Sequence, residues 1–357
     1  MSVFVPYERL KGLVAEIFVK LNLSREDAFI MAEALLSADL RGVESHGVLR
    51  LPTYVRRIKL GLIKANPDIK VVRESKSSVL FDADNGLGQV AATFAMKACI
   101  RKARDGDLAI AGVRRSNHVG ICAYYAMMAL KENMIGFFST NTAALMAPYG
   151  GCEPLLGTNP FAVAIPAGQE FPIVLDMSTS VVPRGKIEMS LKEGKKIPPT
   201  WAIDRDGNPT EDPKEALEGA LLPLGGPKGY GLSIVIDILS GLLMGSSYGR
   251  EIKSMFTDFT KPMGVGHFMM AIKVESFMPI EEFKARVDEY IRTIKNSKKA
   301  KGVKEILLPG ERSWKTERER LKKGIPLSEK AMEALKEAMS LVNLDFDGGL
   351  SLVCSNS

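Results

Sequence analysis

The first sixty residues carry hydrophobic side chains at helical spacing. Residues 10–18 place them at i, i+3 and i+4, and Ser24 followed by Asp27 resembles the N-cap of a second helix. We predict a third helix over residues 47–60, in which Pro52 is tolerated because it lies near the start. The N-terminal segment is therefore predicted to be helical.

From residue 70 the pattern changes to short β-rich runs separated by helical segments. Strands are expected at residues 78–82, 108–113, 135–140, 161–165, 172–176 and 267–274, and helices at residues 89–104, 121–131, 280–294 and 327–342. A further helix over residues 231–243 is so apolar that we predict it to be buried. Residues 143–160, dense in Gly, Pro and small side chains, predict a long functional loop, and residues 192–213 a polar excursion with a turn.

Composition places the chain among ordinary globular proteins. Its 357 residues are 46% hydrophobic and 25% charged, with a mean hydropathy of +0.02. The length exceeds the roughly 250–300 residues at which one hydrophobic core stops growing, so we expect two domains. The longest nearly apolar stretch, residues 230–244, is interrupted by Asp237 and is shorter than the roughly 20 residues of a membrane span. Disordered, collagen-like and membrane-spanning proteins are thereby excluded.

Charge and cysteine usage narrow the possible partners and the cell compartment of the protein. Lys and Arg number 48 against 42 Asp and Glu, a net charge of +6, and the densest basic run, residues 295–304, lacks interleaved aromatic side chains. We therefore predict a solvated loop or face there and no nucleic-acid partner. The first residues lack the features of a secretory signal and the four cysteines lack metal-ligand spacing, so we expect a cytoplasmic protein without zinc or disulfides. Only two glutamines beside many Lys and Glu point to a heat-adapted source.

Histidine is scarce, since the chain has only His46, His118 and His267. Any imidazole that exchanges protons near neutral pH must be one of these three. His118 follows the predicted strand 108–113, and ligands gather at the carboxyl ends of strands in α/β sheets, so it is a candidate acid, base or substrate anchor. A hydrogen-bonded loop histidine is the alternative. His267 lies at the start of a strand, and we predict a structural role for it.

The predicted third helix presents a distinctive polar stripe. On a helical wheel it places within about 80° of one another the side chains of His46, Arg50, Tyr54 and Arg57. Arg50 can bind a carboxylate through two hydrogen bonds, and a histidine within reach can move a proton at a neighbouring carbon–oxygen bond. Ser45 adjoins the imidazole. The alternative interpretation is a solvated polar face.

Glycine-rich turns offer further candidate sites. Gly86, Gly88 and Ala91 match the GxGxxA dinucleotide pattern, but carboxylates at Asp82 and Asp84 precede it, so we interpret it as a turn and helix start. Residues 225–231, with Lys228, combine glycines and a cation at a helix start, which suits an anion as well as a tight turn. Residues 176–180 end a strand, where ribose and phosphates can bind, and residues 308–312 form a late glycine turn.

Several of these segments together resemble one enzyme family. The segments ESHGVLRLPTYVRR, SNHVG, GTNPFA, DMSTSVVPRGKIE, PLGGPKGYGL, GHF and LPGER follow in the order of the malate/L-lactate dehydrogenase family of non-Rossmann NAD(P)-dependent oxidoreductases, from about residue 5 to residue 345. The resemblance implies an α/β (α+β) fold. A helical domain would form from residues 1–68 with about 305–357, and a central α/β cofactor-binding domain of non-Rossmann type from residues 69–304. A homodimer with active sites near the subunit interface is also implied.

The resemblance also assigns roles to residues of this chain. Catalytic roles are implied for His46 and His118, and substrate contacts for Ser45, Arg50, Tyr54 and Thr158. Cofactor contacts are implied for Asn141, Asp176, Met177, Ser178, Lys228, Gly310 and Glu311. No metal is required. Relatives commonly carry DMATSVVARGKI where this chain has Ser178 and Pro183, so NAD and NADP both stay open, with Arg114, Arg115 and Arg184 as candidate partners of a 2′-phosphate.

These inferences combine into one functional hypothesis. We expect reversible hydride transfer between NAD(P)H and a small 2-oxo acid, with malate and oxaloacetate as the first pair. Arg50 would hold the carboxylate, and His46 or His118 would deliver the proton; the sequence does not rank the two. L-Lactate, sulfolactate, ureidoglycolate and cyclic imines are the alternatives within the family. A Rossmann reductase using the GxGxxA turn, or a basic binding module without activity, are the alternatives outside it.

Overall fold

A seven-stranded mixed sheet forms the centre of the molecule in a computed structural model that describes residues 3–345. Its strands, in the order β2-β3-β4-β10-β5-β6-β7, are β2 (Lys70–Glu74), β3 (Ser78–Asp82), β4 (Leu108–Ser116), β10 (Val265–Lys273), β5 (Met134–Thr140), β6 (Phe161–Ile165) and β7 (Ile173–Met177). Only the β3–β4 pair is parallel; the other neighbours are antiparallel. A doubly wound parallel Rossmann sheet, and with it the Rossmann alternative, is therefore wrong for this chain.

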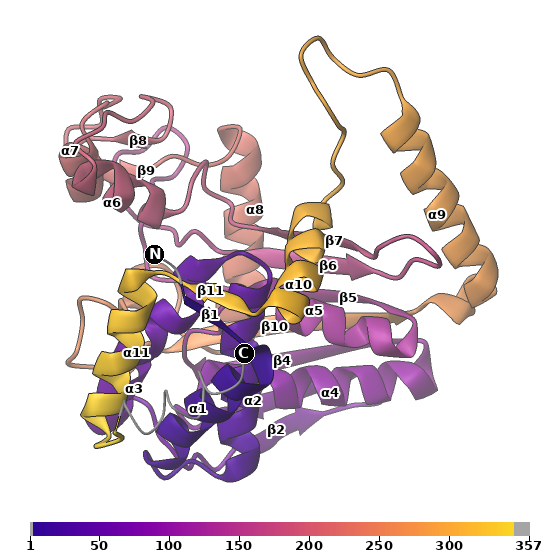
Figure 1. Cartoon of the computed structure of the whole chain (residues 1–357), viewed down its shortest axis with the longest axis horizontal. Coiled ribbons are helices and arrows are strands. Elements are labelled where there is room, and N and C mark those ends of the chain that lie inside the picture. Colours follow the sequence, from indigo (N-terminus) through magenta and orange to yellow (C-terminus); the bar gives the residue numbers. More distant parts are fainter. Residues whose placement is uncertain (1–2, 346–357) are drawn as a thin grey trace.

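Helices cover both faces of this sheet (Figure 1). On β4, Ala109, Ala111 and Val113 join the core made with α4 (Gly88–Gly106) and α5 (Cys122–Met128). The intervening Gly112 faces the other way, where a Cβ would lie 1.8 Å from the Met244 sulfur. Because alternate residues of a strand point to opposite faces, α4 and α5 lie on one side, and α8 (Pro227–Asp237) with its following π-helical turn lies on the other.

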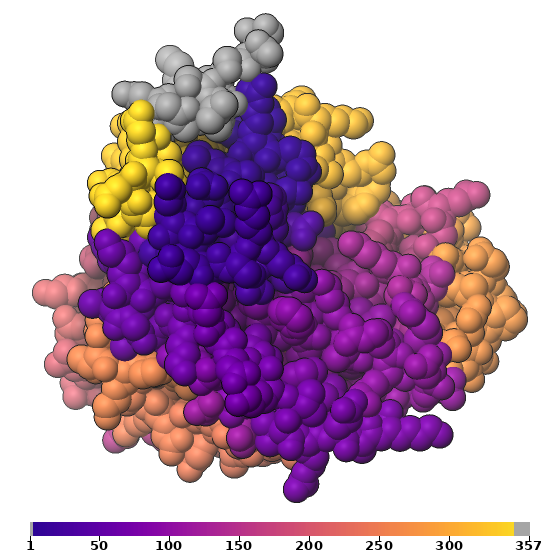
Figure 2. Space-filling model, turned by 90° about the horizontal axis from the view of Figure 1, so that it is seen from below, coloured from indigo at the N-terminus to yellow at the C-terminus, as the bar shows by residue number. Residues whose placement is uncertain are grey.

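The two ends of the described chain build a second core together (Figures 1 and 2). Its elements are β1 (Val3–Val5), α1 (Tyr7–Val19), α2 (Arg25–Leu40), α3 (Leu51–Lys59), β11 (Ile325–Leu327) and α11 (Glu329–Leu341). Helix α10 (Glu311–Lys323) lies against α2 at the side of this core. Strand β1 pairs with β11, and α11 contacts α3. This core is separate from the one between α4, α5 and the sheet. Residues 1–2 and 346–357 of the predicted domain division lie outside the described residues, and its boundaries stay a prediction.

Two smaller parts project from the sheet. One lobe consists of α6 (Arg184–Lys192), β8 (Ala202–Ile203), α7 (Pro213–Glu218) and β9 (Ala220–Leu221), and contains the predicted excursion. In Figure 1 it lies at the upper left, away from α9 (Ile280–Asn296) at the right. The Lys-rich residues after α9 form an exposed loop, as predicted.

Most predicted helices and strands occur in the structure, although β1, β2, α6, β8, α7, β9 and β11 were not predicted. Three further differences concern the helix α3, the segment at 231–243 and the helix α10. Strands β3 and β6 have the expected bounds, and Ser24 caps α2 by accepting the Asp27 N–H. The predicted third helix is wrong at its start, because the chain makes two short 3₁₀ turns, Glu44–His46 and Val48–Arg50, before α3 begins. The polar stripe predicted for this helix is also wrong in part. Its members Tyr54 and Arg57 do not lie on an open polar face but are fully buried.

The other two differences concern an exposed helix and a missed helix. The apolar segment at 231–243 is not buried throughout, since its exposed side chains are Leu232, Val235, Ile238, Leu242 and Leu243. A large apolar surface without a partner in the same chain indicates a contact with another molecule. Helix α10 escaped prediction because its sequence, ERSWKTERERLKK, is so polar that it lacks an apolar stripe.

A buried carboxyl on α2 shapes the turns that carry His46. Asp39 accepts the Val48 N–H at 2.8 Å, and a Cβ on Gly47 would lie 2.1 Å from the same carboxyl group. Gly47 is therefore required between the two turns, and its non-helical backbone ends the first one. Burial raises the pKa of Asp39 to about 7.

The GxGxxA turn has a packing role. A Cβ on Gly88 would lie 2.2 Å from the Asn117 carbonyl oxygen and 2.6 Å from that of His118. The start of α4 therefore lies directly against the backbone that carries His118, which leaves no room there for a pyrophosphate. The interpretation as a turn and helix start agrees with this geometry.

Substitution Gly88→Ala tests this packing. The added Cβ meets two backbone oxygens that cannot rotate away, so we expect the free energy of unfolding to fall by about 2 kcal/mol or more. Gly12→Ala is the matched control, because Gly12 lies inside α1 with nothing within 4 Å of its Cβ position. It should stabilise the chain by roughly 0.5–1 kcal/mol. Denaturant unfolding of both variants gives the comparison, and equal effects would contradict the proposed contact.

Substitution Asp39→Asn tests the buried carboxyl. A pKa raised from 3.8 to about 7 means that the folded state keeps a proton that the unfolded state loses, so wild-type stability declines as the pH rises between these values. The amide oxygen of the variant still accepts from Val48, but the amide does not titrate. The variant should therefore gain about 2–4 kcal/mol over wild type between pH 4 and pH 8. Unfolding curves at a series of pH values measure this gain, and parallel profiles would refute it.

Candidate active site

The imidazole of His118 is held from one side by a buried tyrosine. The Tyr54 hydroxyl lies 2.6 Å from His118 Nδ1, and the Gly120 N–H donates to the same nitrogen at 3.2 Å. Gln89 Nε2, from the first turn of α4, donates to the Tyr54 oxygen at 2.6 Å. Because Nδ1 accepts, the proton of neutral His118 lies on Nε2, for which no partner occurs within residues 3–345.

The second histidine lies against the first. The rings of His46 and His118 stack with centroids 5.7 Å apart and planes inclined by 22°. Ser45 Oγ lies 2.9 Å from His46 Nδ1, and Arg50 Nε donates to the Ser45 carbonyl at 2.6 Å. The Arg50 guanidinium also lies over the Phe256 ring at 4.4 Å. Five predicted residues from two distant segments therefore meet at one place.

Burial and charge keep both imidazoles neutral. Desolvation, with the nearby Arg50, lowers the pKa of His46 to about 4. Desolvation lowers the pKa of His118 well below its usual value, and the charges of His46, Arg50 and His267 add to this. Both histidine residues are half-buried, so neither is fully sealed from solvent. A bound anion would raise both pKa values, which couples proton uptake to substrate binding.

His267 has a structural position, as predicted. It is fully buried on β10, where Nδ1 contacts Thr140 Oγ1 at 2.9 Å and Nε2 contacts Ser116 Oγ at 2.8 Å. Both nitrogens are therefore used to join β10 to β5 and β4. Burial lowers its pKa to about 3, so it remains neutral.

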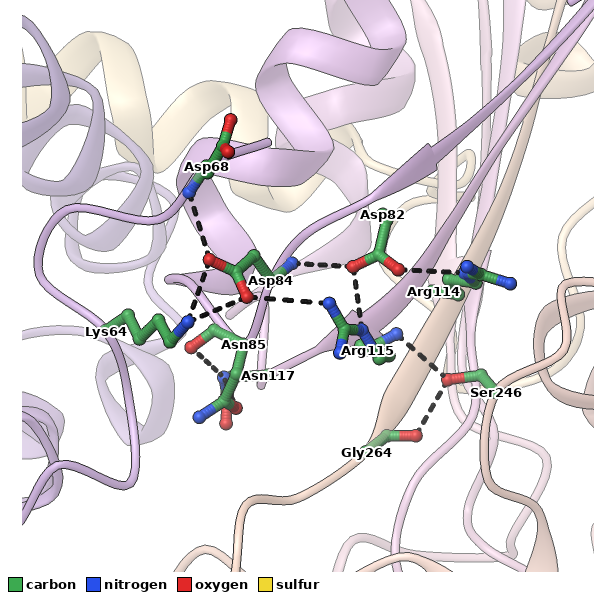
Figure 3. A network of polar contacts seen from close by, with 10 residues as sticks. All are labelled: Lys64, Asp68, Asp82, Asp84, Asn85, Arg114, Arg115, Asn117, Ser246 and Gly264. Atoms are coloured by element: carbon green, nitrogen blue, oxygen red, sulfur yellow. Dashed lines mark hydrogen bonds and ion pairs between the residues drawn. The ribbon is translucent and has the colours of Figure 1, made fainter. Parts of the chain in front are cut away.

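A network beneath the His118 loop fixes the loop to β3 (Figure 3). Asn117 Nδ2 donates to Asn85 Oδ1 at 3.1 Å and to the Gly86 carbonyl at 2.9 Å. Arg114 and Arg115 donate to the Asp82 carboxylate at 3.0 and 2.8 Å. The network explains why two carboxylates precede the glycine turn.

The three arginines considered for a 2′-phosphate all have acidic partners. Arg114 and Arg115 pair with Asp82, and Arg184 pairs with Glu188 at 3.1 Å. These pairs partly neutralise each guanidinium, so the structure favours none of the three as a phosphate site. The choice between NAD and NADP therefore stays open.

Three of the predicted cofactor residues, Asp176, Met177 and Ser178, lie at or just after the carboxyl end of β7. Asp176 Oδ2 accepts the Ala123 N–H at 2.9 Å, which places it at the start of α5, just after the His118 loop. Thr179 donates to the Thr158 carbonyl, and the Leu224 N–H donates to the Thr179 carbonyl at 2.9 Å. These bonds place Ser178 and Thr158 beside the glycine turn that leads to the exposed Lys228.

Three other predicted cofactor residues have structural contacts. Asn141 is fully buried; its amide donates to Asp237 and the Ser247 carbonyl and accepts the Gly266 N–H. The buried Glu311 carboxylate pairs with Lys295 and Lys315. Gly310 needs its left-handed φ of +82° and lies against Val174 of β7. The Asn141 and Glu311 side chains are therefore engaged in contacts within the protein, and Gly310 packs against β7.

The described residues contain neither a candidate metal cluster nor a membrane-spanning helix. Among residues 3–345, no group of three or more His, Cys, Asp or Glu side chains is placed to hold a metal ion. In the same range, no helix combines the length and apolar character that crossing a membrane requires.

Three residues that shape the site were not predicted from the sequence. Gln89 and Asn117 lie within matched motifs, GLGQVA and SNHVG, but neither motif shows that the side chain contacts Tyr54 or the 85–86 turn. Asp39 lies within a helix, and its only sequence signal is a carboxylate among apolar neighbours. All three act through contacts distant in sequence, which hydrophobic patterning does not reveal.

Comparison with known proteins shows which family the chain resembles. The family model described as malate/L-lactate dehydrogenase matches residues 5–336. The malate dehydrogenase of Pyrococcus horikoshii is 46% identical over 349 residues, 96% of each chain. The NAD(+) ureidoglycolate dehydrogenase of Escherichia coli O157:H7 is 34% identical over 304 residues, 85% of this chain and 86% of that one.

A solved structure shows the same fold. The sulfolactate dehydrogenase of Methanocaldococcus jannaschii superposes with a TM-score of 0.91 at 41% identity, covering 97% of this chain and 99% of that one. The mixed α/β fold class implied by the sequence resemblance is confirmed. The match of the family model over most of the chain, together with these identities, shows that the chain belongs to the malate/L-lactate dehydrogenase family.

Proposed function

We propose that the chain catalyses reversible hydride transfer between NAD(P)H and the carbonyl of a small 2-oxo acid, with oxaloacetate and malate as the pair. The observation that carries the proposal is the meeting of Arg50, His46 and His118 at one half-buried place. The pair is chosen from the relative named malate dehydrogenase. Sulfolactate, L-lactate, ureidoglycolate and cyclic imines are the alternative substrates.

Arg50 is proposed to bind the substrate carboxylate. Its Nε is used by the Ser45 carbonyl and its face lies on Phe256, while neither Nη has a hydrogen-bond partner within residues 3–345. The guanidinium is thereby held in one orientation with two donors available. A planar pair of donors binds a carboxylate bidentately and fixes the position of the adjoining carbonyl.

His118 is proposed to exchange the proton. Its Nδ1 faces Tyr54 and Gly120, so Nε2 is the nitrogen available to a substrate oxygen. In the reduction, the Nε2–H bond breaks as the bond from that proton to the substrate oxygen forms. His46 and Ser45 are proposed to contact the substrate beside it. Thr158 lies near the end of β7 and is a further proposed contact.

The residues at the end of β7 fit a dinucleotide. Asp176 and Ser178 offer oxygen atoms for ribose hydroxyls, and Lys228 is exposed on the first turn of α8, after glycines whose φ angles are +58° and +63°. This combination of a helix start, a flexible turn and a cation suits a phosphate. When bound, the nicotinamide supplies the hydride. Met177 and Gly310 would shape the site, with Asn141 and Glu311 behind it.

The assembly and its setting are also part of the proposal. The exposed apolar face of α8 and its following turn supports a homodimer that buries it. We further propose a cytoplasmic protein from a heat-adapted source, as the composition indicates. The basic residues 295–304 lack interleaved aromatic side chains, so they give no support to the alternative of a nucleic-acid-binding module.

An absorbance assay of NAD(P)H tests the function. The substrates are oxaloacetate, pyruvate, sulfopyruvate and a cyclic imine, each with both cofactors. We expect His118→Gln to lower kcat by about 100-fold or more, because a positioned acid–base group contributes that much. His46→Gln and Arg50→Lys should chiefly raise KM. If His46→Gln lowers kcat and His118→Gln has little effect, His46 and not His118 exchanges the proton. Wild-type protein that is inactive with every combination of substrate and cofactor would refute the function.

Light scattering tests the homodimer. The chain of 39.0 kDa should give twice that mass in solution. A double variant, Val235→Glu with Leu242→Glu, should be monomeric, because it places two charges in the proposed interface. Leu321→Glu is the control, since Leu321 is equally exposed but lies on α10. A wild-type monomer, or a dimer that survives the double variant, would contradict the proposal.

A further inference from the structure

Gln89 is a buried polar residue that no step of the proposed reaction has used. It lies in the first turn of α4 and is fully buried. Its Nε2 donates to the Tyr54 oxygen at 2.6 Å, while its Oε1 has no hydrogen-bond partner within residues 3–345. A buried amide with one unpaired oxygen costs free energy, so its presence calls for a physical reason.

An amide differs from other side chains in that it both donates and accepts hydrogen bonds. A half-turn of the terminal amide group exchanges Nε2 and Oε1 without changing the shape of the side chain. With Nε2 toward Tyr54, the tyrosine oxygen accepts and its O–H points to His118 Nδ1. With Oε1 toward Tyr54, the tyrosine O–H points to Gln89, and the tyrosine oxygen becomes free to accept a proton donor.

These two arrangements match two protonation states of His118. Neutral His118 with its proton on Nε2 needs a donor at Nδ1, which Tyr54 supplies. A His118 that carries a proton on Nδ1 needs an acceptor there, and the longer contact from the Gly120 N–H, at 3.2 Å, is then given up. We propose that Gln89 is a positioning residue that turns its amide to let Tyr54 donate to His118 or accept from it, as the reaction requires.

The inference rests on the proposed function and deepens it. In the reduction, His118 enters with protons on both nitrogens, and the Nε2–H bond breaks as the O–H bond of the product forms. The electron pair of the broken bond stays on Nε2, so His118 is left neutral with its proton on Nδ1. Tyr54 must accept that proton's hydrogen bond throughout the step, and Gln89 must then accept from Tyr54.

The surroundings of His118 make this support necessary. The groups that face it are His46 and Arg50 from the turns before α3, Tyr54 from α3 and His267 from β10. Arg50 is a cation, and the carboxylate of Asp176 in β7 already accepts the Ala123 N–H at the start of α5. Within the described residues, Tyr54 is the side chain in hydrogen-bond contact with Nδ1. The doubly protonated ring therefore depends on Tyr54 and, through it, on Gln89.

NMR titration of ¹⁵N-labelled histidine tests the inference without turnover. The chain has only three histidines, so substitution of His46 and His267 in turn assigns the His118 signals. Gln89→Glu supplies an acceptor and a negative charge, and should raise the pH midpoint of His118 by about one unit or more. Gln89→Leu removes the acceptor and should lower it. Gln169→Glu, at the exposed second glutamine, is the matched control and should leave it unchanged.

The Tyr54→Phe background separates positioning from charge alone. If Gln89 acts through Tyr54, most of the rise caused by Gln89→Glu disappears in this background. An equal rise in both backgrounds, or no change of the midpoint with either Gln89 variant, would overturn the inference.

A kinetic measurement on Gln89→Leu gives an independent readout. It can still be made if the Gln89→Glu protein does not fold. In Gln89→Leu, the falling limb of kcat against pH should move to lower pH, with kcat reduced about tenfold or more and KM little changed. An unmoved limb would contradict the role. Wild-type protein without turnover would refute the proposed function, while the NMR titration would still decide the role of Gln89.

Discussion

The site depends on one hydrogen bond that joins two separately packed parts of the chain. Tyr54 belongs to the core built by the two chain ends, whereas His118 lies on a loop after a strand of the central sheet. Their contact at 2.6 Å requires that α3 and the loop after β4 keep a fixed relative position. The contact between Gly88 and the backbone of Asn117 and His118 supplies this constraint, because α4 packs against both parts. Small shifts of α4 would therefore separate Tyr54 from the imidazole.

Burial of His46 and His118 affects both their resting protonation state and their response to substrate. It lowers the pKa of both site histidines, so the resting protein holds neutral rings beside the cation of Arg50. An anionic substrate changes the balance, because its carboxylate offsets the positive charge and favours protonated imidazole. Proton transfer is thereby linked to occupancy of the Arg50 site. Since neutral imidazole cannot donate from both nitrogens, the groups behind Nδ1 matter as much as the groups in front of Nε2.

The sequence predicts elements better than it predicts contacts between them. Strands β3 and β6 follow from local patterns of β-branched and apolar residues, and their bounds are as expected. The predicted stripe groups His46, Arg50 and Tyr54, which do lie near one another, but it places them on one continuous helix. The helix is interrupted because Gly47 adopts a non-helical backbone that a helical wheel does not contain. Tyr54 was expected on a polar face but is buried, since Gln89 and His118 satisfy its hydroxyl. Such pairing between distant residues leaves no periodic signal in the sequence.

The late helix α10 shows why a polar segment can be essential to a site it does not line. Arg320 pairs with Glu44 and also donates to the Asp39 carbonyl, and Glu317 pairs with Arg41 at 2.7 Å. These bonds hold the end of α2, where the Asp39 carboxyl fixes the turn after His46. Isolated ion pairs at a protein surface contribute little to stability, but several that act on one short segment restrict its conformations. Residues near 320 thereby support the turns that carry His46, although the two regions lie far apart in the sequence.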